Sequence, residues 1–234
     1  GFQAIATATN AIYLGARSAA GTGATAESAI AIGTDVKANG TSAIGMGVDS
    51  VSSGNMSTAV GALSSATGDN SVAMGAKSTA AASGVVALGA GAAGSQINGV
   101  AVGAGASATG INAVYLGART APGTGSTGTS SIAIGTDVAA TGDFSTALGF
   151  QTKGGGSAAI AMGYIATSSG VHAIAVGFQS ISTGLNSVYL GARSIAGTGA
   201  TADGAVALGT DVTSSGLSSL AAGTCRRRQT RGPG

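Results

Sequence analysis

The hydrophobic and polar positions of this chain repeat around one glycine. Aligning the sequence on it gives sixteen copies, separated by twelve intervals of 14 residues and three of 18 residues. The residue just before the glycine is aliphatic in fourteen of fifteen copies, and the residue three before it is Ile, Val or Leu in thirteen. A small residue or a tyrosine lies between them. This period-two alternation predicts a short β-strand ending at each repeated glycine. The repeated glycines are Gly1, Gly15, Gly33, Gly47, Gly61, Gly75, Gly89, Gly103, Gly117, Gly135, Gly149, Gly163, Gly177, Gly191, Gly209 and Gly223.

The second half of each repeat predicts a second strand. The third and fifth residues after the glycine are nearly always small or β-branched, and another glycine usually closes the repeat at the seventh, as in GTDVAATG at 135–142. Two strands and two bends then fill each coil, whereas a three-sided coil takes roughly 18 residues. We therefore predict an all-β parallel roll with two walls. Its coils, stacked at ~4.8 Å, would form a rod of roughly 70 Å.

Charge placement orients the two strands. Every charged residue before Arg226 lies two or four positions after the repeated glycine, or six before it. Charges are rarely buried unpaired, so we expect these columns to face water. The first strand carries no charge on either face, so its Ala column should face the opposite wall and its aliphatic columns should pack on something outside the chain. Left uncovered, that strip would exceed the apolar patch that a monomer tolerates, which predicts an obligate oligomer.

Composition excludes several classes of protein. The 234 residues include 43 glycines, 8% charged residues, 3% aromatic residues and no tryptophan, which is too apolar for disorder and too poor in large side chains for an ordinary core. Gly-X-Y triplets are absent, which argues against collagen. The sequence has no apolar run of about 20 residues and no signal peptide. We expect any export signal to lie outside this sequence.

Three repeats carry a family resemblance: NSVAMGAKSTA (70–80), SIAIGTDVAATG (131–142) and AIAVGFQSISTG (173–184). They resemble the NSVAIGxxSxAxG repeat of YadA-like heads of trimeric autotransporter adhesins, and the resemblance covers residues 1–223. It implies a left-handed parallel β-roll that forms a homotrimer at the bacterial cell surface. A stalk and an outer-membrane anchor would lie outside this sequence, which we expect to be a fragment of a longer repeat array. The implied trimer core is Ile30, Ile32, Ile44, Met46, Val72, Met74, Val114, Leu116, Ile132, Ile134, Ile160, Met162, Ile174 and Val176.

The resemblance also implies a function. Heads of this family are non-catalytic adhesins that bind host matrix proteins such as collagen, or host cells, and some make bacteria clump. Met74 stands where the family repeat has isoleucine. Residue-by-residue transfer places collagen binding at Asn70, Ser71, Val72, Gly75 and Ser78. A structural fibre of a phage or a secreted protein is an alternative. An ice-binding solenoid is another, but it requires a regular outward array of threonines that this sequence lacks.

No motif predicts catalysis, a metal or a cofactor. His172 is the only histidine and occupies a column rich in asparagine, so we interpret it as a bend residue. One histidine and one cysteine cannot form a structural zinc site or a complete thiol-protease site. The aspartates of the three GTDV motifs are too widely spaced for a calcium ladder, and we expect them to be solvated. GAGAAG lacks the lysine and the helix of a phosphate loop.

The last residues, 224–234 (TCRRRQTRGPG), differ from the repeats. They hold four of the ten basic residues, so the positive net charge comes from this tail. A basic tail is compatible with nucleic-acid binding, but we expect an added or disordered end and no nucleic-acid partner. Cys225 is a lone thiol, which fits a protein that relies on no disulfides.

One longer phrase occurs three times: NAVYLGARTAPGTG at 112–125, with close copies at 10–23 and 186–199. Its tyrosine occupies the Ala column, and each copy precedes an 18-residue interval. Duplication of one repeat together with its neighbour explains why the phrase recurs, because GTDV also occurs in the repeat that follows each copy. It does not explain why a large inward residue accompanies an insertion. We hypothesise that the four extra residues displace the far wall, admit the ring and receive its hydroxyl. The loops would then be ridges beside Arg17, Arg119 and Arg193, and candidate ligand surfaces.

Overall fold

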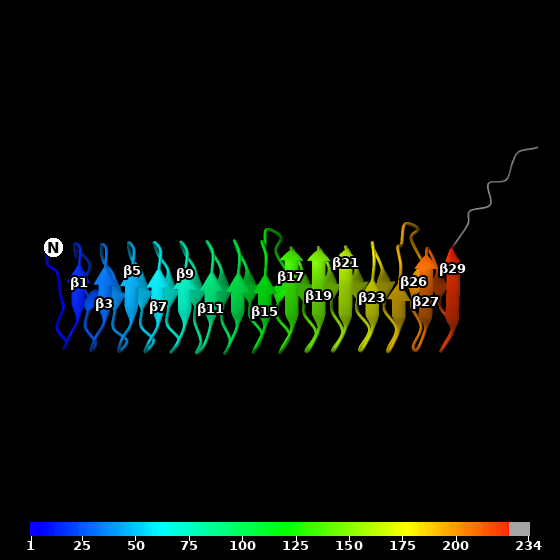
Figure 1. The fold of residues 1–234 in the computed structure, drawn as a ribbon, viewed down its shortest axis with the longest axis horizontal. Helices are drawn as coiled ribbons and strands as arrows, with labels where there is room; N and C mark the ends of the chain where they lie inside the picture. Colours follow the sequence, from blue (N-terminus) through cyan, green and yellow to red (C-terminus); the bar gives the residue numbers. More distant parts are fainter. Residues whose placement is uncertain (225–234) are drawn as a thin grey trace, which may run out of the picture.

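The computed structural model describes residues 1–224 as a straight stack of coils with two walls (Figure 1). One wall is a 15-stranded sheet of the odd-numbered strands, and the other is a 14-stranded sheet of the even-numbered strands. Each strand pairs in parallel with the equivalent strand of the next coil. Within the described residues no helix is long and apolar enough to cross a membrane. The prediction of an all-β parallel roll with 14-residue coils is confirmed.

The first sheet contains mostly three-residue strands that end just before the repeated glycine. Its strands are β1 (Ile12–Leu14), β3 (Ile30–Ile32), β5 (Ile44–Met46), β7 (Thr58–Val60), β9 (Val72–Met74), β11 (Val86–Leu88), β13 (Val100–Val102), β15 (Val114–Leu116), β17 (Ile132–Thr136), β19 (Thr146–Phe150), β21 (Ile160–Tyr164), β23 (Ile174–Val176), β25 (Val188–Leu190), β27 (Val206–Thr210) and β29 (Leu220–Thr224).

The second sheet contains two-residue strands. They are β2 (Gly23–Ala24), β4 (Lys37–Ala38), β6 (Val51–Ser52), β8 (Ser65–Ala66), β10 (Thr79–Ala80), β12 (Ala93–Gly94), β14 (Ser107–Ala108), β16 (Gly125–Ser126), β18 (Ala139–Ala140), β20 (Lys153–Gly154), β22 (Thr167–Ser168), β24 (Ile181–Ser182), β26 (Gly199–Ala200) and β28 (Thr213–Ser214).

The core between the walls is narrow and made of small side chains. Alanines of the first sheet and small residues of the second are fully buried, as at Ala31 and Ala38. Larger residues are buried at a few coils, with alanine beside Val138 (Ala147) but glycine beside Val36 (Gly45). Val36 is fully buried, and a Cβ added at Gly45 would lie 2.7 Å from its Cγ1. The exchange of alanine for glycine at this one coil therefore makes room for a valine.

The bends follow three columns of residues with positive φ, namely the repeated glycine, the residue five before it, and the residue two after it, such as Asp49 at φ 54°. Repeated glycines such as Gly61 adopt φ near +129°, and a Cβ there would lie 2.7 Å from the carbonyl carbon of Gly75 in the next coil. A second column adopts the left-handed region with residues other than glycine, including Asn70 and His172, both at φ 56°. His172 is a bend residue as predicted, and its Nδ1 lies 3.2 Å from Oδ1 of Asn186.

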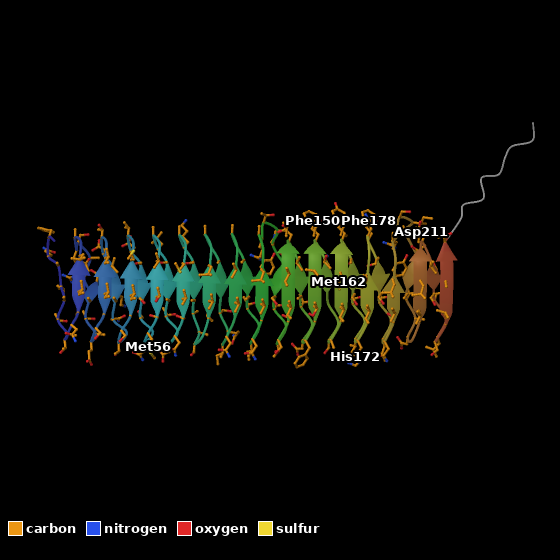
Figure 2. The ribbon with its side chains drawn as sticks, in the orientation of Figure 1. Met56, Phe150, Met162, His172, Phe178 and Asp211 are labelled. Carbon is orange, nitrogen blue, oxygen red and sulfur yellow. The ribbon has the colours of Figure 1, made fainter. Side chains whose placement is uncertain are left out.

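The outer face of the first sheet is open in the single chain. Its aliphatic side chains alternate with the buried alanines but remain half-buried or exposed, with Leu14 58% and Met74 44% exposed. Met162 lies near the middle of this face (Figure 2). The prediction that another surface covers these side chains remains a prediction.

The expectation that all charged columns face water is wrong at two positions. Asp137 and Asp211 are each only 7% exposed. Both lie in the coil that follows an 18-residue coil, where an inserted loop covers them. Lys153, in contrast, is exposed on the second sheet as expected.

Candidate functional site

Inserted loops interrupt the otherwise regular edge of the roll at residues 18–22, 120–124 and 194–198. The second and third project visibly between β15 and β17 and near β26 (Figure 1). The second sheet stays in register across each insertion but keeps a single residue pair there, which is Ala108 with Ser126 in the second case and Ser182 with Ala200 in the third. The extra residues therefore all lie between the repeated glycine and the second strand.

The tyrosine of each 18-residue coil points into the roll. Tyr13 is 7% exposed, and Tyr115 and Tyr189 are completely buried. Each hydroxyl donates a hydrogen bond to the carbonyl three residues ahead, at the bend where the loop begins: Tyr115 to Ala118 at 3.1 Å, with the same contact at 2.9 Å in the other two coils. Burial raises the pKa of the Tyr115 and Tyr189 phenols. The ring is thus fully accommodated and its polar end is satisfied.

The insertion makes room by removing one inward side chain. In a 14-residue coil the residue before the second strand is buried, as Thr152 is before β20. The corresponding residue before β16 is Thr124, which is only partly buried, and its hydroxyl donates to the Ala121 carbonyl at 2.8 Å within the loop. The ring of Tyr115 lies in the core where such a threonine would otherwise point. This arrangement supports the hypothesis that tyrosine and insertion belong together.

An aspartate from the following coil holds each loop. Oδ1 of Asp137 accepts hydrogen bonds from the backbone N–H groups of Thr120 at 2.6 Å and Ala121 at 2.8 Å, and Oδ2 accepts from the Thr120 hydroxyl at 2.9 Å. The amides of Ala121 and Thr120 hold the pKa of the Asp137 carboxyl below its usual range. Asp35 and Asp211 make the same three contacts. The GTDV aspartates are therefore loop anchors, and the expectation that they are merely solvated is wrong.

The arginines beside the loops also have a structural task. The Nε of Arg119 donates to the Thr124 carbonyl at 2.7 Å, and Arg17 and Arg193 make the equivalent bond at 3.0 and 2.9 Å. The arginine therefore spans the base of its own loop. As candidate ligand residues, these arginines can offer only their remaining guanidinium nitrogens.

A recess of about 300 Å³ lies beside the second loop. Loop residues 121–124 line it together with Asp137 of the next coil, and Gln151, Lys153 and Ile165 of the two coils after that complete the lining. The sequence did not reveal this recess, because its lining combines the loop with residues of three later coils, which only the tertiary structure brings together. The presence of Gln151 and Lys153 at outward positions was the only signal.

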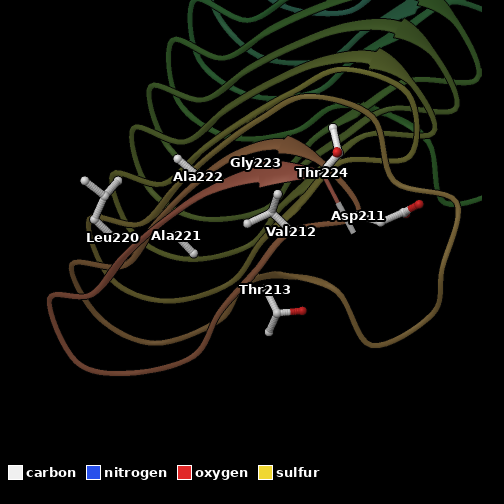
Figure 3. Close-up of a pocket in the computed structure, with 8 residues that line it drawn as sticks. All are labelled: Asp211, Val212, Thr213, Leu220, Ala221, Ala222, Gly223 and Thr224. Carbon is white, nitrogen blue, oxygen red and sulfur yellow. The ribbon is translucent and has the colours of Figure 1, made fainter. Parts of the chain in front are cut away.

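A larger recess of about 550 Å³ lies at β28 and β29 (Figure 3). Val212 and Ala221, which belong to interior columns, line it together with backbone of the last described strands. Each of these two strands has a partner on one side only. This recess therefore lies at the last coil of the described residues, where the described sheets end.

The residues transferred from the resemblance lie on one coil, but they differ in access. Ser71 and Ser78 are fully buried, and their hydroxyls donate to the carbonyls of Gly68 at 2.6 Å and Gly75 at 2.8 Å. These two serines close bends and are out of reach of a ligand. Only Asn70, at an exposed bend, and half-buried Val72 present side chains outward.

The sequence analysis missed a stack of aromatic rings. Phe150, Tyr164 and Phe178 follow the repeated glycine in three successive coils, with ring centroids 5.2 and 5.4 Å apart and nearly parallel planes. Phe150 and Phe178 lie on the same edge of the roll as the inserted loops (Figure 2). An aromatic residue at the same repeat position in three coils was the signal, and the stack reinforces the pairing of these coils.

Within residues 1–224 no group of three or more His, Cys, Asp or Glu side chains is placed to hold a metal ion. Cys225, Arg226 and Arg228, and the expectation of a basic tail with no nucleic-acid partner, lie outside the described residues.

Comparison with known proteins assigns the repeats to a family. A comparison with curated protein sequences gives no significant match. The family model described as YadA head domain repeat (2 copies) matches residues 38–64, 66–92, 95–120, 121–152, 155–180 and 168–194. These segments cover more than half of the chain and follow the same coils that the structure shows. The chain therefore belongs to the YadA head domain repeat family.

Proposed function

We propose that this chain is the head of a bacterial surface adhesin that assembles as a left-handed, homotrimeric β-roll and binds host matrix proteins or host cells. Family membership supports an adhesin-type role at the bacterial surface. The observation that carries the assembly is the open aliphatic face of the first sheet, which runs along the whole roll.

The two sheets differ in a way that favours assembly through the first. Outward positions of the first sheet hold side chains such as Ile134 and Met162, whereas those of the second hold Lys37, Thr79 and Lys153. Removing aliphatic surface from water is favourable by about 25 cal/mol per Å², before the costs of association are subtracted. Three copies that bring their first sheets to a common axis would cover this strip and leave the second sheet, with its lysines and mostly small outward residues, and the inserted loops in water.

Light scattering on the purified protein tests the assembly. We expect a trimer for the wild type and loss of the trimer for Ile134→Asp, because three carboxylates would be buried near one axis. Thr79→Asp is the matched control, since it places the same charge outward on the second sheet and should remain trimeric. A monomeric wild type, or a trimeric Ile134→Asp with an unchanged melting temperature, would contradict the proposed interface.

A solid-phase binding screen against collagens, fibronectin, laminin and heparin tests the adhesive role. Three chains should give avidity, so we expect the trimer to bind an immobilised matrix protein more tightly than the assembly-deficient variant does. Absence of binding to every matrix protein and to host cells would refute the adhesive role.

A further inference from the structure

The recess beside the second inserted loop combines loop and coil residues in a small open site. Loop residues 121–124 face Gln151, Lys153 and Ile165 across a volume of about 300 Å³. That volume is at the lower end of the range for small-molecule sites, so the recess suits one ring-sized unit of a ligand.

The Asp137 carboxylate and two loop carbonyls at this recess already accept hydrogen bonds. Both oxygens of Asp137 accept bonds from Thr120 and Ala121. The Ala121 carbonyl accepts from the Thr124 hydroxyl, and the Thr124 carbonyl accepts from Arg119 Nε. The carboxylate and these two loop carbonyls are therefore committed to holding the loop.

The donors, in contrast, are free. Within the described residues, the backbone N–H of Gly123 and the side chains of Gln151 and Lys153 have no partner at hydrogen-bond distance. Lys153 is exposed and forms no ion pair with any described residue. A Cβ added at Gly123 would meet no atom within 4 Å, so this bend is open to an approaching ligand. The recess thus offers one ammonium group and amide donors to a ligand rich in acceptors.

We propose that this recess binds a carboxylate-bearing monosaccharide unit of a glycan. The Lys153 ammonium pairs with the carboxylate, and the Gln151 amide and the Gly123 N–H bind ring or acyl oxygens. Pro122 and Ile165 provide apolar surface for the C–H face of the sugar ring. This proposal rests on the proposed adhesin role and names a ligand class for it.

The first inserted loop provides an internal comparison. The positions equivalent to Gln151 and Lys153 two coils beyond it are Asp49 and Val51. That loop has the same aspartate anchor and arginine contact. It therefore presents an acid in place of the amide and an aliphatic side chain in place of the ammonium, and we expect it not to bind a carboxylate.

Calorimetric and NMR titration of the assembled protein with two defined saccharides tests the site. The probes are 3′-sialyllactose and a hyaluronan hexasaccharide, which carry the carboxylate on a sialic acid and on a uronic acid respectively. Lactose and the carboxyl-reduced hexasaccharide are their matched controls. We expect binding of at least one acidic saccharide, with shifts of residues in the recess, and at least about tenfold weaker binding of its control. The acidic saccharide that binds identifies the source of the carboxylate.

The double variant Gln151→Asp/Lys153→Val locates the binding. It installs the pair that the chain already carries at Asp49 and Val51, with aspartate at a left-handed position as at φ 54° in Asp49, so we expect it to fold. It should lose at least about tenfold in affinity. Lys37→Val removes a lysine from the same repeat column outside the recess and should leave affinity unchanged.

Several results would overturn the inference. They are absence of binding to both acidic saccharides, equal binding of the carboxyl-free controls, or wild-type affinity in the double variant. Matrix binding without saccharide binding would remove this inference and leave the adhesive role standing. Saccharide binding without attachment to matrix or cells would contradict the adhesive role alone.

Discussion

Deleting residues 120–123 should destabilise the protein when Tyr115 is retained and should be tolerated when Tyr115 is replaced by alanine. The deletion restores a 14-residue interval and moves Thr124 to the third position after Gly117. That position is equivalent to Thr152, which is fully buried. In the shortened coil the threonine and the tyrosine ring would compete for the same space in the core.

The expected magnitudes follow from packing. Tyr115 is completely buried, so Tyr115→Ala in the full-length coil should cost about 3–5 kcal/mol by leaving a cavity. The deletion alone should cost about 1–3 kcal/mol or more by overpacking. The two changes together recreate the arrangement of Ala147 and Thr152, both fully buried in a 14-residue coil. The double variant should therefore be more stable than either single variant, with a coupling energy of at least about 2 kcal/mol.

Guanidinium unfolding measures all four proteins at one protomer concentration, because an oligomer's apparent stability depends on concentration. Tyr115→Phe separates the hydroxyl from the ring, and should cost only about 1 kcal/mol through loss of the bond to Ala118. Additive effects of the deletion and Tyr115→Ala would show that the ring and the insertion are physically unrelated.

Three further predictions concern the core and the loop anchor. Gly45→Ala should lower the unfolding free energy by about 1–3 kcal/mol, and adding Val36→Ser should restore most of it, as denaturant midpoints would show. Ser180→Ala should leave stability unchanged or raise it, because its buried hydroxyl has no hydrogen-bond partner among residues 1–224, whereas Ser182→Ala should cost about 1 kcal/mol by breaking a 2.6 Å bond; equal losses would contradict this reasoning. Folding lowers the pKa of the Asp137 carboxyl. The Asp137 carboxylate should therefore stabilise the fold at pH values above its pKa in the unfolded chain, and this stabilisation should be lost as the pH falls through its pKa in the folded chain. The melting-temperature deficit of Asp137→Asn should shrink over the same pH range, and a pH-independent deficit would argue against the anchor.

The sequence determined the architecture because the repeated glycines show directly how many residues form one coil. The spacing of glycines such as Gly61 and Gly75 defines one coil, since a Cβ added at Gly61 would lie only 2.7 Å from the carbonyl carbon of Gly75 in the next coil. The alternation of aliphatic residues with alanine determines which face is inside, because a strand turns alternate side chains to opposite faces. The inward position of Tyr115 and its association with the inserted residues followed from the same columns.

Only the tertiary structure decided how the insertions are held and what they cover. Asp137 and Thr120 are 17 positions apart in the chain and meet because the coils stack. The expectation that Asp137 faces water rested only on its position in the repeat. In the structure, a loop from the preceding coil donates hydrogen bonds to Asp137 and shields it from water. The recess with Gln151 and Lys153 arises likewise, because a loop of one coil lies beside residues of the three coils that follow it. The residue pattern within one repeat specifies the fold of its coil. The contacts of an inserted loop, in contrast, involve residues of neighbouring coils, which the pattern of a single repeat does not contain.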